Sequence, residues 1–273
     1  MKKQVLLSFD VEEFDLPREH GGEISVAEGV KVSSEGLCKV LDLLKKRGVK
    51  ATFFVTGNFA EGAPELVSRM VKEGHEVACH GVDHFSPKKT DVEKSKEIVE
   101  KIAGVPVVGW RQPRMFKISY SELKRCGYAY DSSVNPAFIP GRYNNTKVPR
   151  KPYVKGGVLE IPTSVTGLRV PMFWLALHLF PLRMYCGLAR KVLRDTGYFA
   201  TYFHPWEFAS LSGFKEVPWY IKRNSGMELV QRLDKVICEL EKEGGEFVGY
   251  AEFAECVMRM KCTKRKKSKL CKK

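Results

Sequence analysis

Carboxylates and imidazoles follow several apolar segments of this sequence, and their types and spacing suit metal-dependent chemistry. His80 and His84 are four residues apart, directly after an apolar segment that ends at Cys79. Two imidazoles at this spacing can bind one metal ion where a turn brings them to the same side. The pattern alone fits two ordinary surface or core histidines equally well. Polar residues placed in the same way near both ends of the chain favour the metal site.

Asp10 and Glu12 follow the first apolar run, 5–9, and are separated by one residue. In an extended chain both side chains therefore point to the same face. Beside two histidines, one carboxylate could bind the metal as a third ligand while the other acts as a base. Two histidines and one carboxylate with an open position form a catalytic zinc arrangement, which can hydrolyse acyl groups. Taken alone, the motif also fits a solvated acidic turn.

Strand-like and helix-like segments alternate along the chain. Strands are predicted at 5–9, 51–55, 76–79, 105–110, 158–161, 198–203 and 246–250. Helices are predicted to begin at Ser33, at Pro64, at the capping box Thr90-x-x-Glu93, at Ser119 and at Ser225-x-x-Glu228. This βαβα order predicts a parallel sheet, open or closed into a barrel. Arg111 and His204 also follow strand candidates, so a barrel would bring them to the same end as the motifs above.

Composition predicts one globular domain, residues 1–258, followed by a basic tail, 259–273. The tail holds nine Lys or Arg residues and no acidic residue, which leaves +5 of the formal net charge of +14 for the rest of the chain. Such a tail is predicted to be disordered, with attraction to anionic lipid or nucleic acid as a second interpretation. Nucleic-acid binding is not expected, because no stacking or groove motif accompanies the tail. The sequence leaves the oligomeric state open.

Cysteine usage and the N-terminus predict a cytoplasmic protein. Eight cysteines are scattered without a short regular spacing, which favours free thiols in a reducing compartment. The first apolar run is too short for a secretory signal. The apolar segment 168–194 contains Pro171, Pro181 and Arg183 and so is no membrane span. It is predicted to be a buried helical pair. The alternative is an amphipathic element that contacts lipid at the inner face of the membrane or forms an apolar groove.

Six motifs of the chain resemble the polysaccharide deacetylases, also called carbohydrate esterase family 4 or the NodB-like family. They are LSFDVEE (7–13), ATFFVTGNF (51–59), HEVACHGVDH (75–84), GWRQPRMF (109–116), YDSS (130–133) and FHPWE (203–207). The resemblance implies a distorted, incomplete (β/α) barrel of about seven parallel strands. It also implies a divalent metal, zinc first, with Co2+, Ni2+ or Fe2+ as alternatives.

The resemblance assigns a role to each motif residue by position. Asp10 would be the catalytic base, and Glu12, His80 and His84 would be the metal ligands. Arg111 would orient Asp10, and His204 would be the general acid. The backbone N–H of Arg114 would stabilise the oxyanion.

Three positions depart from the usual family pattern. The first motif of the family usually has two adjacent Asp residues, whereas here Val11 separates Asp10 from Glu12. An arginine, Arg114, follows Pro113 where an aromatic residue is usual. The Asp-Trp pair that usually supports the general acid is not evident. Arg114 is therefore predicted to contact an anionic substrate group, and either Asp131 or Glu207 to support His204. Further substrate contacts are predicted as follows: Tyr202 at the acyl pocket, and Trp110 and Trp206 stacking on a sugar, with burial as the alternative for both tryptophans.

Together these residues predict a hydrolase that removes an N-acetyl group from an amino sugar by attack of a metal-bound water. The substrate is expected to be a surface-polysaccharide or lipid-linked glycan precursor. The alternatives are deformylation of a lipid-linked amino sugar, hydrolysis of a cyclic amide, or a non-catalytic carbohydrate- or membrane-binding protein. A binder would not need a base, three ligands, an arginine and an acid together.

Overall fold

The computed structural model describes residues 2–89 and 91–270, and for residues 262–270 it describes the backbone alone. Its strands are β1 (Lys3–Val11), β2 (Thr52–Val55), β3 (Glu76–Cys79), β4 (Gly109–Trp110), β5 (Tyr130–Asp131), β6 (Phe138–Ile139), β7 (Tyr143–Asn144), β8 (Tyr153–Lys155), β9 (Val158–Glu160), β10 (Tyr198–Phe203) and β11 (Gly245–Phe247). Its helices are α1 (Leu16–Glu19), α2 (Val26–Arg47), α3 (Gly57–Gly62), α4 (Pro64–Lys72), α5 (Asp91–Ala103), α6 (Tyr120–Arg125), α7 (Trp174–Leu179), α8 (Leu182–Thr196), α9 (Trp219–Lys222), α10 (Met227–Lys242) and α11 (Tyr250–Leu270). Two 3-10 turns, η1 (Pro113–Met115) and η2 (Pro205–Phe208), complete the described elements.

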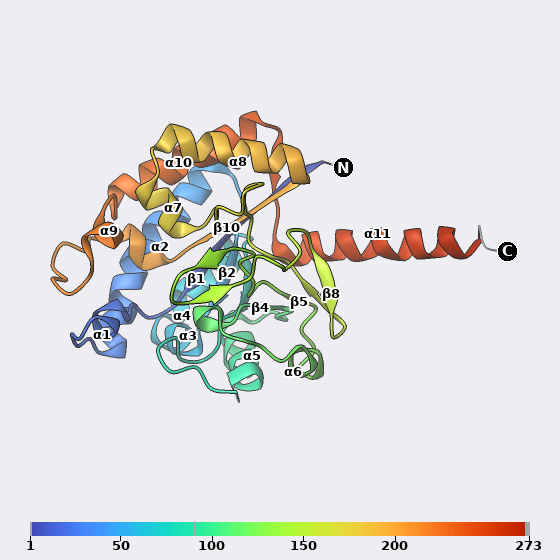
Figure 1. Cartoon of the computed structure of the whole chain (residues 1–273). Coiled ribbons are helices and arrows are strands. Elements are labelled where there is room, and N and C mark those ends of the chain that lie inside the picture. Colours follow the sequence, from blue (N-terminus) through green and yellow to red (C-terminus); the bar gives the residue numbers. More distant parts are fainter. Residues whose placement is uncertain (1, 90, 271–273) are drawn as a thin grey trace.

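One curved sheet forms the centre of the molecule (Figure 1). Its strand order is β10-β1-β2-β3-β4-β5-β9-β8, and β11 pairs with the first residues of β1. All of these pairs are parallel except β8 with β9. Helices such as α2, α5 and α8 pack on the outside of the sheet, as the βαβα order of the sequence predicts. The fold is thus a distorted, incomplete (β/α) barrel, and this prediction is confirmed.

Side chains of β1 alternate between two hydrophobic cores. Leu7 and Phe9 belong to the larger core, between the sheet and the surrounding helices. Leu6 belongs to a second core inside the curved sheet. The first turns of α11 cover that inner core with Tyr250 and Phe253. Because strand side chains alternate, Ser8 and Asp10 lie on the same inner face of the sheet as Leu6, nearer to the carboxyl end of β1 than the inner core.

Helix starts agree with the sequence at some positions and differ at others. Pro64 begins α4, and the Ser119 side chain caps α6 as predicted. The helix predicted from Ser33 begins earlier, at Val26, because Ser25 and Glu28 form the capping box there. Ser225 does not cap α10, whose N-cap is Gly226. The predicted cap of α5, Thr90, lies outside the described residues.

The predicted domain boundary at residue 258 falls within α11. The backbone of this helix continues to Leu270 and projects away from the rest of the molecule (Figure 1). Most of the predicted tail, 259–273, is therefore helical in the described backbone. The disorder predicted for residues 271–273 stays a prediction, since these lie outside the described residues.

The apolar segment 168–194 forms the predicted helical pair, α7 and α8. Tyr185, Ala189 and Leu193 of α8 are buried in the larger core. The start of α7 instead turns toward the end of β10, where it contributes Trp174 to a pocket. Among the described helices, none is long and apolar enough to cross a bilayer.

Candidate functional site

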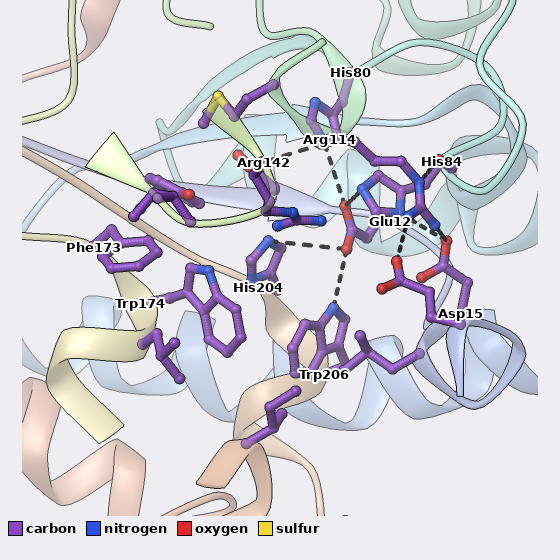
Figure 2. A pocket seen from close by; sticks show the side chains of 18 of the residues that line it. Glu12, Asp15, His80, His84, Arg114, Arg142, Phe173, Trp174, His204 and Trp206 are labelled. Atoms are coloured by element: carbon purple, nitrogen blue, oxygen red, sulfur yellow. Dashed lines mark hydrogen bonds and ion pairs between the residues drawn. The ribbon is translucent and has the colours of Figure 1, made fainter. Parts of the chain in front are cut away.

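A pocket of about 320 Å³ opens at the carboxyl ends of the parallel strands (Figure 2). Side chains from the ends of β1, β3 and β10 form its floor, and these are the polar motifs predicted from the sequence. Its walls come from segments after β4, from the β6–β7 hairpin, and from α7 and α9. Among the residues that line it are Asp10, Glu12, His80, His84, Arg114, Tyr202, His204 and Trp206. The convergence at one end of the barrel confirms the reasoning from strand ends.

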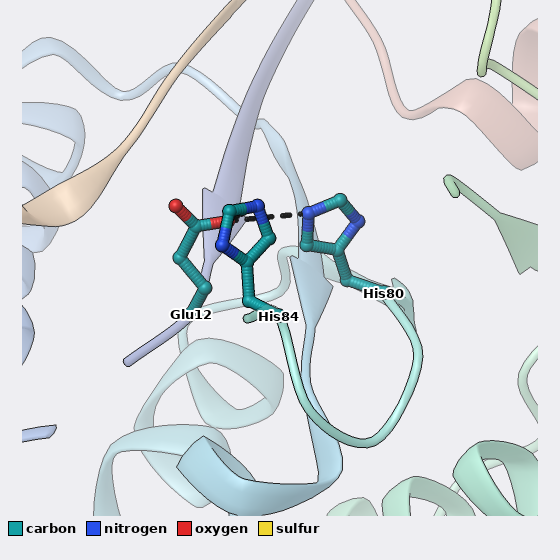
Figure 3. A group of neighbouring side chains, drawn as sticks. All are labelled: Glu12, His80 and His84. Atoms are coloured by element: carbon teal, nitrogen blue, oxygen red, sulfur yellow. Dashed lines mark ion pairs between the residues drawn. The ribbon is translucent and has the colours of Figure 1, made fainter. Parts of the chain in front are cut away.

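Glu12, His80 and His84 form a compact group of possible metal ligands (Figure 3). One ligand atom from each lies within 4.8 Å of the others. The Nε2 atoms of His80 and His84 are 3.3 and 3.0 Å from Glu12 Oε2. All three residues are buried. The structure therefore brings together the three predicted ligands and, among the described side chains, no other such group.

Hydrogen bonds at Nδ1, the ring nitrogen that faces away from Glu12, orient the imidazoles of His80 and His84. His80 Nδ1 is 2.8 Å from the carbonyl oxygen of Arg111, and His84 Nδ1 is 2.8 Å from Asp15 Oδ2. Because both partners are acceptors, each Nδ1 carries the proton. In the neutral rings the Nε2 lone pairs then face Glu12. This is how metal-binding histidines are commonly held.

The Glu12 carboxylate provides a test of whether a cation fits. Its Oε2 is buried and accepts no hydrogen bond from the described residues, although two Nε2 atoms stand close to it. A buried carboxylate oxygen without a donor is costly. A divalent cation between this oxygen and two lone pairs would satisfy all three atoms. Without a metal, burial lowers the pKa of His84, but the charges of Glu12 and Asp15 outweigh it and raise the pKa to about 9.

A tight loop after β3 sets the spacing of the two histidines. Gly81 has a φ of +76°, and a Cβ there would come within 2.8 Å of Pro113 Cγ. Glycine is therefore required both for the turn and for the close approach. The backbone N–H of His84 donates to Glu13 Oε1 at 2.9 Å, which fixes the end of the loop. Glu13 thus supports the site without lining the pocket.

Asp10 is paired with Arg111 beneath the pocket. The Arg111 guanidinium is fully buried and donates to Asp10 Oδ1 at 2.5 Å and to Ser8 Oγ at 3.0 Å. Its other N–H groups reach Ser132 and Tyr250. Burial acts to raise the pKa of Asp10, but the charges of Arg111 and the nearby histidines outweigh it and lower the pKa. Asp10 is thus held ionised by Arg111, which is the pairing that the family resemblance implies.

Glu207 is the carboxylate that supports His204. Its Oε1 is 2.8 Å from His204 Nδ1, and its Oε2 is 2.8 Å from His178 Nε2. The other nitrogen of His178 is 2.5 Å from the Arg223 carbonyl oxygen. His178 is fully buried and has a partner at each ring nitrogen. The alternative support, Asp131, lies on β5, bonded to Ser133 and opposite Glu160, and does not line the pocket.

The two predicted sugar-stacking tryptophans differ. Trp110 is only 1% exposed, packs against Tyr128 in the larger core and does not line the pocket. Its predicted substrate contact is wrong, because Trp110 points to the outer face of β4. Trp206 lines the pocket, stacks on His204 with ring centroids 4.9 Å apart, and donates to Glu12 Oε1 at 3.1 Å. Trp206 therefore holds a predicted metal ligand.

Tyr202 and Arg114 both line the pocket, as predicted. Tyr202 is buried beside Phe173 and His204. Arg114 pairs with Asp15 at 3.1 Å and also with Glu19, so its charge is already neutralised. The predicted contact of Arg114 with an anionic substrate group therefore needs correction, whereas its backbone N–H as an oxyanion donor stays a prediction.

Several pocket residues gave no signal in the sequence. Asp15 holds both His84 and Arg114, and Phe173, Trp174 and Arg142 form a wall above His204 (Figure 2). Asp15 stands three residues after Glu12, just beyond the first motif, and this nearness was the one available hint. The wall residues come from segments without a motif, and only the fold brings them to the pocket.

Comparison with known proteins gives a consistent result. Residues 2–130 match the family model described as polysaccharide deacetylase. The chain is 38% identical over 119 residues to the peptidoglycan-N-acetylmuramic acid deacetylase PdaA of Bacillus subtilis, covering 40% of this chain and 45% of that protein. It is 34% identical over 92 residues to a peptidoglycan-N-acetylglucosamine deacetylase of Bacillus cereus, covering 31% of each. The chain thus matches less than half the length of these two relatives.

Solved structures show the same fold over nearly the whole chain. A putative polysaccharide deacetylase from Mycobacterium smegmatis superposes with a TM-score of 0.69 at 21% identity, covering 95% of this chain and 92% of that one. This likeness extends the shared fold well beyond residue 130.

Proposed function

We propose that this chain, whose residues 2–130 match the model of the polysaccharide deacetylase family, is a metal-dependent hydrolase of N-acetylated amino sugars. The observation that carries the proposal is the buried Glu12 Oε2, which has no hydrogen-bond donor among the described residues and faces two imidazole nitrogens. A site that only bound carbohydrate would not need this arrangement beside an ionised Asp10 and a supported His204.

Glu12, His80 and His84 would hold the metal. Two histidines, one carboxylate and open space toward a pocket suit zinc first, with Co2+, Ni2+ and Fe2+ as alternatives. A bound divalent metal would polarise the acyl carbonyl and make water a better nucleophile at neutral pH.

Asp10 and His204 would carry the protons. Asp10 is ionised by its pairing with Arg111, so it can take a proton from the attacking water. Burial alone would lower the pKa of His204, but Glu12 and Glu207 outweigh it and raise the pKa. His204 is therefore more readily protonated near neutral pH and can give its proton to the leaving amine. Arg111 and Glu207 position these two residues.

We propose a surface-polysaccharide or lipid-linked glycan precursor as the substrate, handled in the cytoplasm at the inner face of the membrane. The relatives above are named for peptidoglycan sugars, which supports an N-acetylated amino sugar of the cell envelope. The free thiols of the described cysteines are compatible with a reducing compartment.

The test is an acyl-release assay with defined metal content. The protein is stripped of metal, reloaded with zinc or cobalt, and assayed for acetate and formate release from a panel of amino-sugar substrates. Asp10→Asn is expected to keep the metal and lose activity, because it removes the base and leaves the ligands. His84→Ala is expected to lose both. A matched control, His75→Gln, changes a buried histidine away from the pocket and should lose neither.

Two results would contradict the proposal. If metal does not bind stoichiometrically and no acyl group is released, the chain is not a metal-dependent hydrolase. Formate release without acetate release would instead favour a deformylase of the same fold.

A further inference from the structure

The hairpin of β6 and β7 places one side chain over the pocket. Its turn is Ile139-Pro140-Gly141-Arg142, in which the N–H of Arg142 donates to the Ile139 carbonyl at 3.1 Å. Gly141 has a φ of +74°. Proline followed by a glycine at positive φ fits a type II turn, which needs little further support. Arg142 follows directly, lines the pocket and points inward in Figure 2.

Contacts at the base of the hairpin hold it in place. The N–H of Asn145 donates to the Ala137 carbonyl at 2.9 Å. The Arg169 guanidinium bonds the carbonyl oxygens of Pro136 and Val148, at 3.0 and 2.9 Å, and so joins the two sides of the hairpin. The position of Arg142 over the pocket is therefore set by the fold of this segment.

The three arginines at the site differ in whether a carboxylate already pairs with their charge. Arg111 is paired with Asp10, and Arg114 is paired with Asp15 and Glu19. The Arg142 guanidinium has no hydrogen bond or ion pair among the described residues, and the residue is exposed to solvent. Of the two arginines that line the pocket, Arg142 is thus the one whose charge is unpaired within the described part of the chain.

We propose that Arg142 binds an anionic substituent, a carboxylate or a phosphate, on the amino sugar that enters the pocket. An unsubstituted N-acetylhexosamine is neutral and offers hydroxyl and amide oxygens to a guanidinium but no negative charge. A carboxylate or phosphate matches the guanidinium in charge and can accept two parallel hydrogen bonds from it. This inference rests on the proposed function and narrows its substrate class. It moves the predicted anion contact from Arg114, whose charge is neutralised, to Arg142.

The test compares matched glycans with and without a negative charge. The neutral probe is a chitooligosaccharide. The anionic probes are the same backbone with carboxylate-bearing lactyl ethers at O3, and an N-acetylhexosamine with a diphosphate at C1. For the zinc-loaded enzyme we expect Arg142→Gln to lower the ratio of kcat/KM between anionic and neutral probes by about 10- to 100-fold. Whichever anionic probe shows the loss identifies the source of the charge.

Two further variants make the test specific. Arg142→Lys should recover part of the ratio, since it restores the charge without the fork of donors. Arg183→Gln removes the charge of another exposed arginine, outside the pocket, and should leave the ratio unchanged. An equal effect of Arg142→Gln on neutral and anionic probes, or no effect on either, would overturn the inference.

A binding measurement separates this inference from the proposed function. Dissociation constants for the same probes are measured in Asp10→Asn, with and without Arg142→Gln, so that no turnover is needed. Weaker binding of the anionic probes alone upholds the inference even if the wild-type protein releases no acyl group. Unchanged binding overturns it even if the enzyme is active.

Discussion

Replacing Glu207 with glutamine should change the protonation of His204 while leaving the fold intact. The Glu207 carboxylate is fully buried between His204 Nδ1 and His178 Nε2, at 2.8 Å from each. Glutamine has the same shape, and its carbonyl oxygen can accept from His204 while its amide donates to a neutral His178. The backbone N–H of His204, which also bonds Glu207 Oε1, keeps an acceptor. The variant therefore removes one negative charge and leaves no buried polar group without a partner.

The expected size of the effect follows from this hydrogen bond. A bond to a charged partner contributes about 1.5–3 kcal/mol. One pKa unit corresponds to about 1.4 kcal/mol, so the pKa of His204 should fall by about 1–2 units. The general acid must be protonated, and activity is lost as the pH rises through its pKa. The alkaline limb of the kcat profile should thus move to lower pH by about 1–2 units.

The assay is acyl release by the zinc-loaded enzyme as a function of pH, with metal content and thermal unfolding measured in parallel. Glu160→Gln is the matched control, since Glu160 is a buried glutamate that does not line the pocket. Its alkaline limb should coincide with that of the wild type. If Glu207→Gln keeps its metal and fold but its alkaline limb does not move, Glu207 does not tune the acid and the reasoning is refuted.

Three further predictions concern the metal ligands and the core. Trp206→Phe removes the donor to Glu12 and should weaken metal binding about 10- to 100-fold in a chelator competition, and an unchanged affinity would contradict this role. Metal uptake at pH 7 should release protons, because His84 without metal has a pKa of about 9. The heat of metal binding, measured by calorimetry, should therefore change with the ionisation enthalpy of the buffer, and equal heats in all buffers would contradict the prediction. Trp110→Ala should lower the free energy of unfolding by about 3–5 kcal/mol in urea, with substrate preference unaltered, and a loss under about 1 kcal/mol would argue against a core position.

Much of the site could be predicted because it depends on local sequence. Asp10 and Glu12 share a face through the alternation of a strand, and His80 and His84 are joined by a short glycine turn. These residues follow strands, and parallel strands end at the same edge of a sheet. Arg111 and His204 reach the pocket for the same reason. Residue type and position along a strand were therefore enough to predict that these six residues meet at one edge of the sheet.

The partners of these residues could not be predicted, because they depend on how distant segments pack. Asp131 and Glu207 were equal candidates to support His204, and the 3-10 turn after β10 decides for Glu207. Trp110 is in a motif, yet the alternation of β4 turns it into the core.

The sequence by itself determined the order of strands and helices and the ionisable groups at the strand ends, because these follow from short-range periodicity. Only the tertiary structure decided which charges are already paired. Arg114 is neutralised by Asp15 and Glu19, whereas Arg142, which is 32 residues after the end of β4, has no charged partner among the described residues and lies over the pocket. Charge pairing depends on distances across the fold, and no local pattern specifies them.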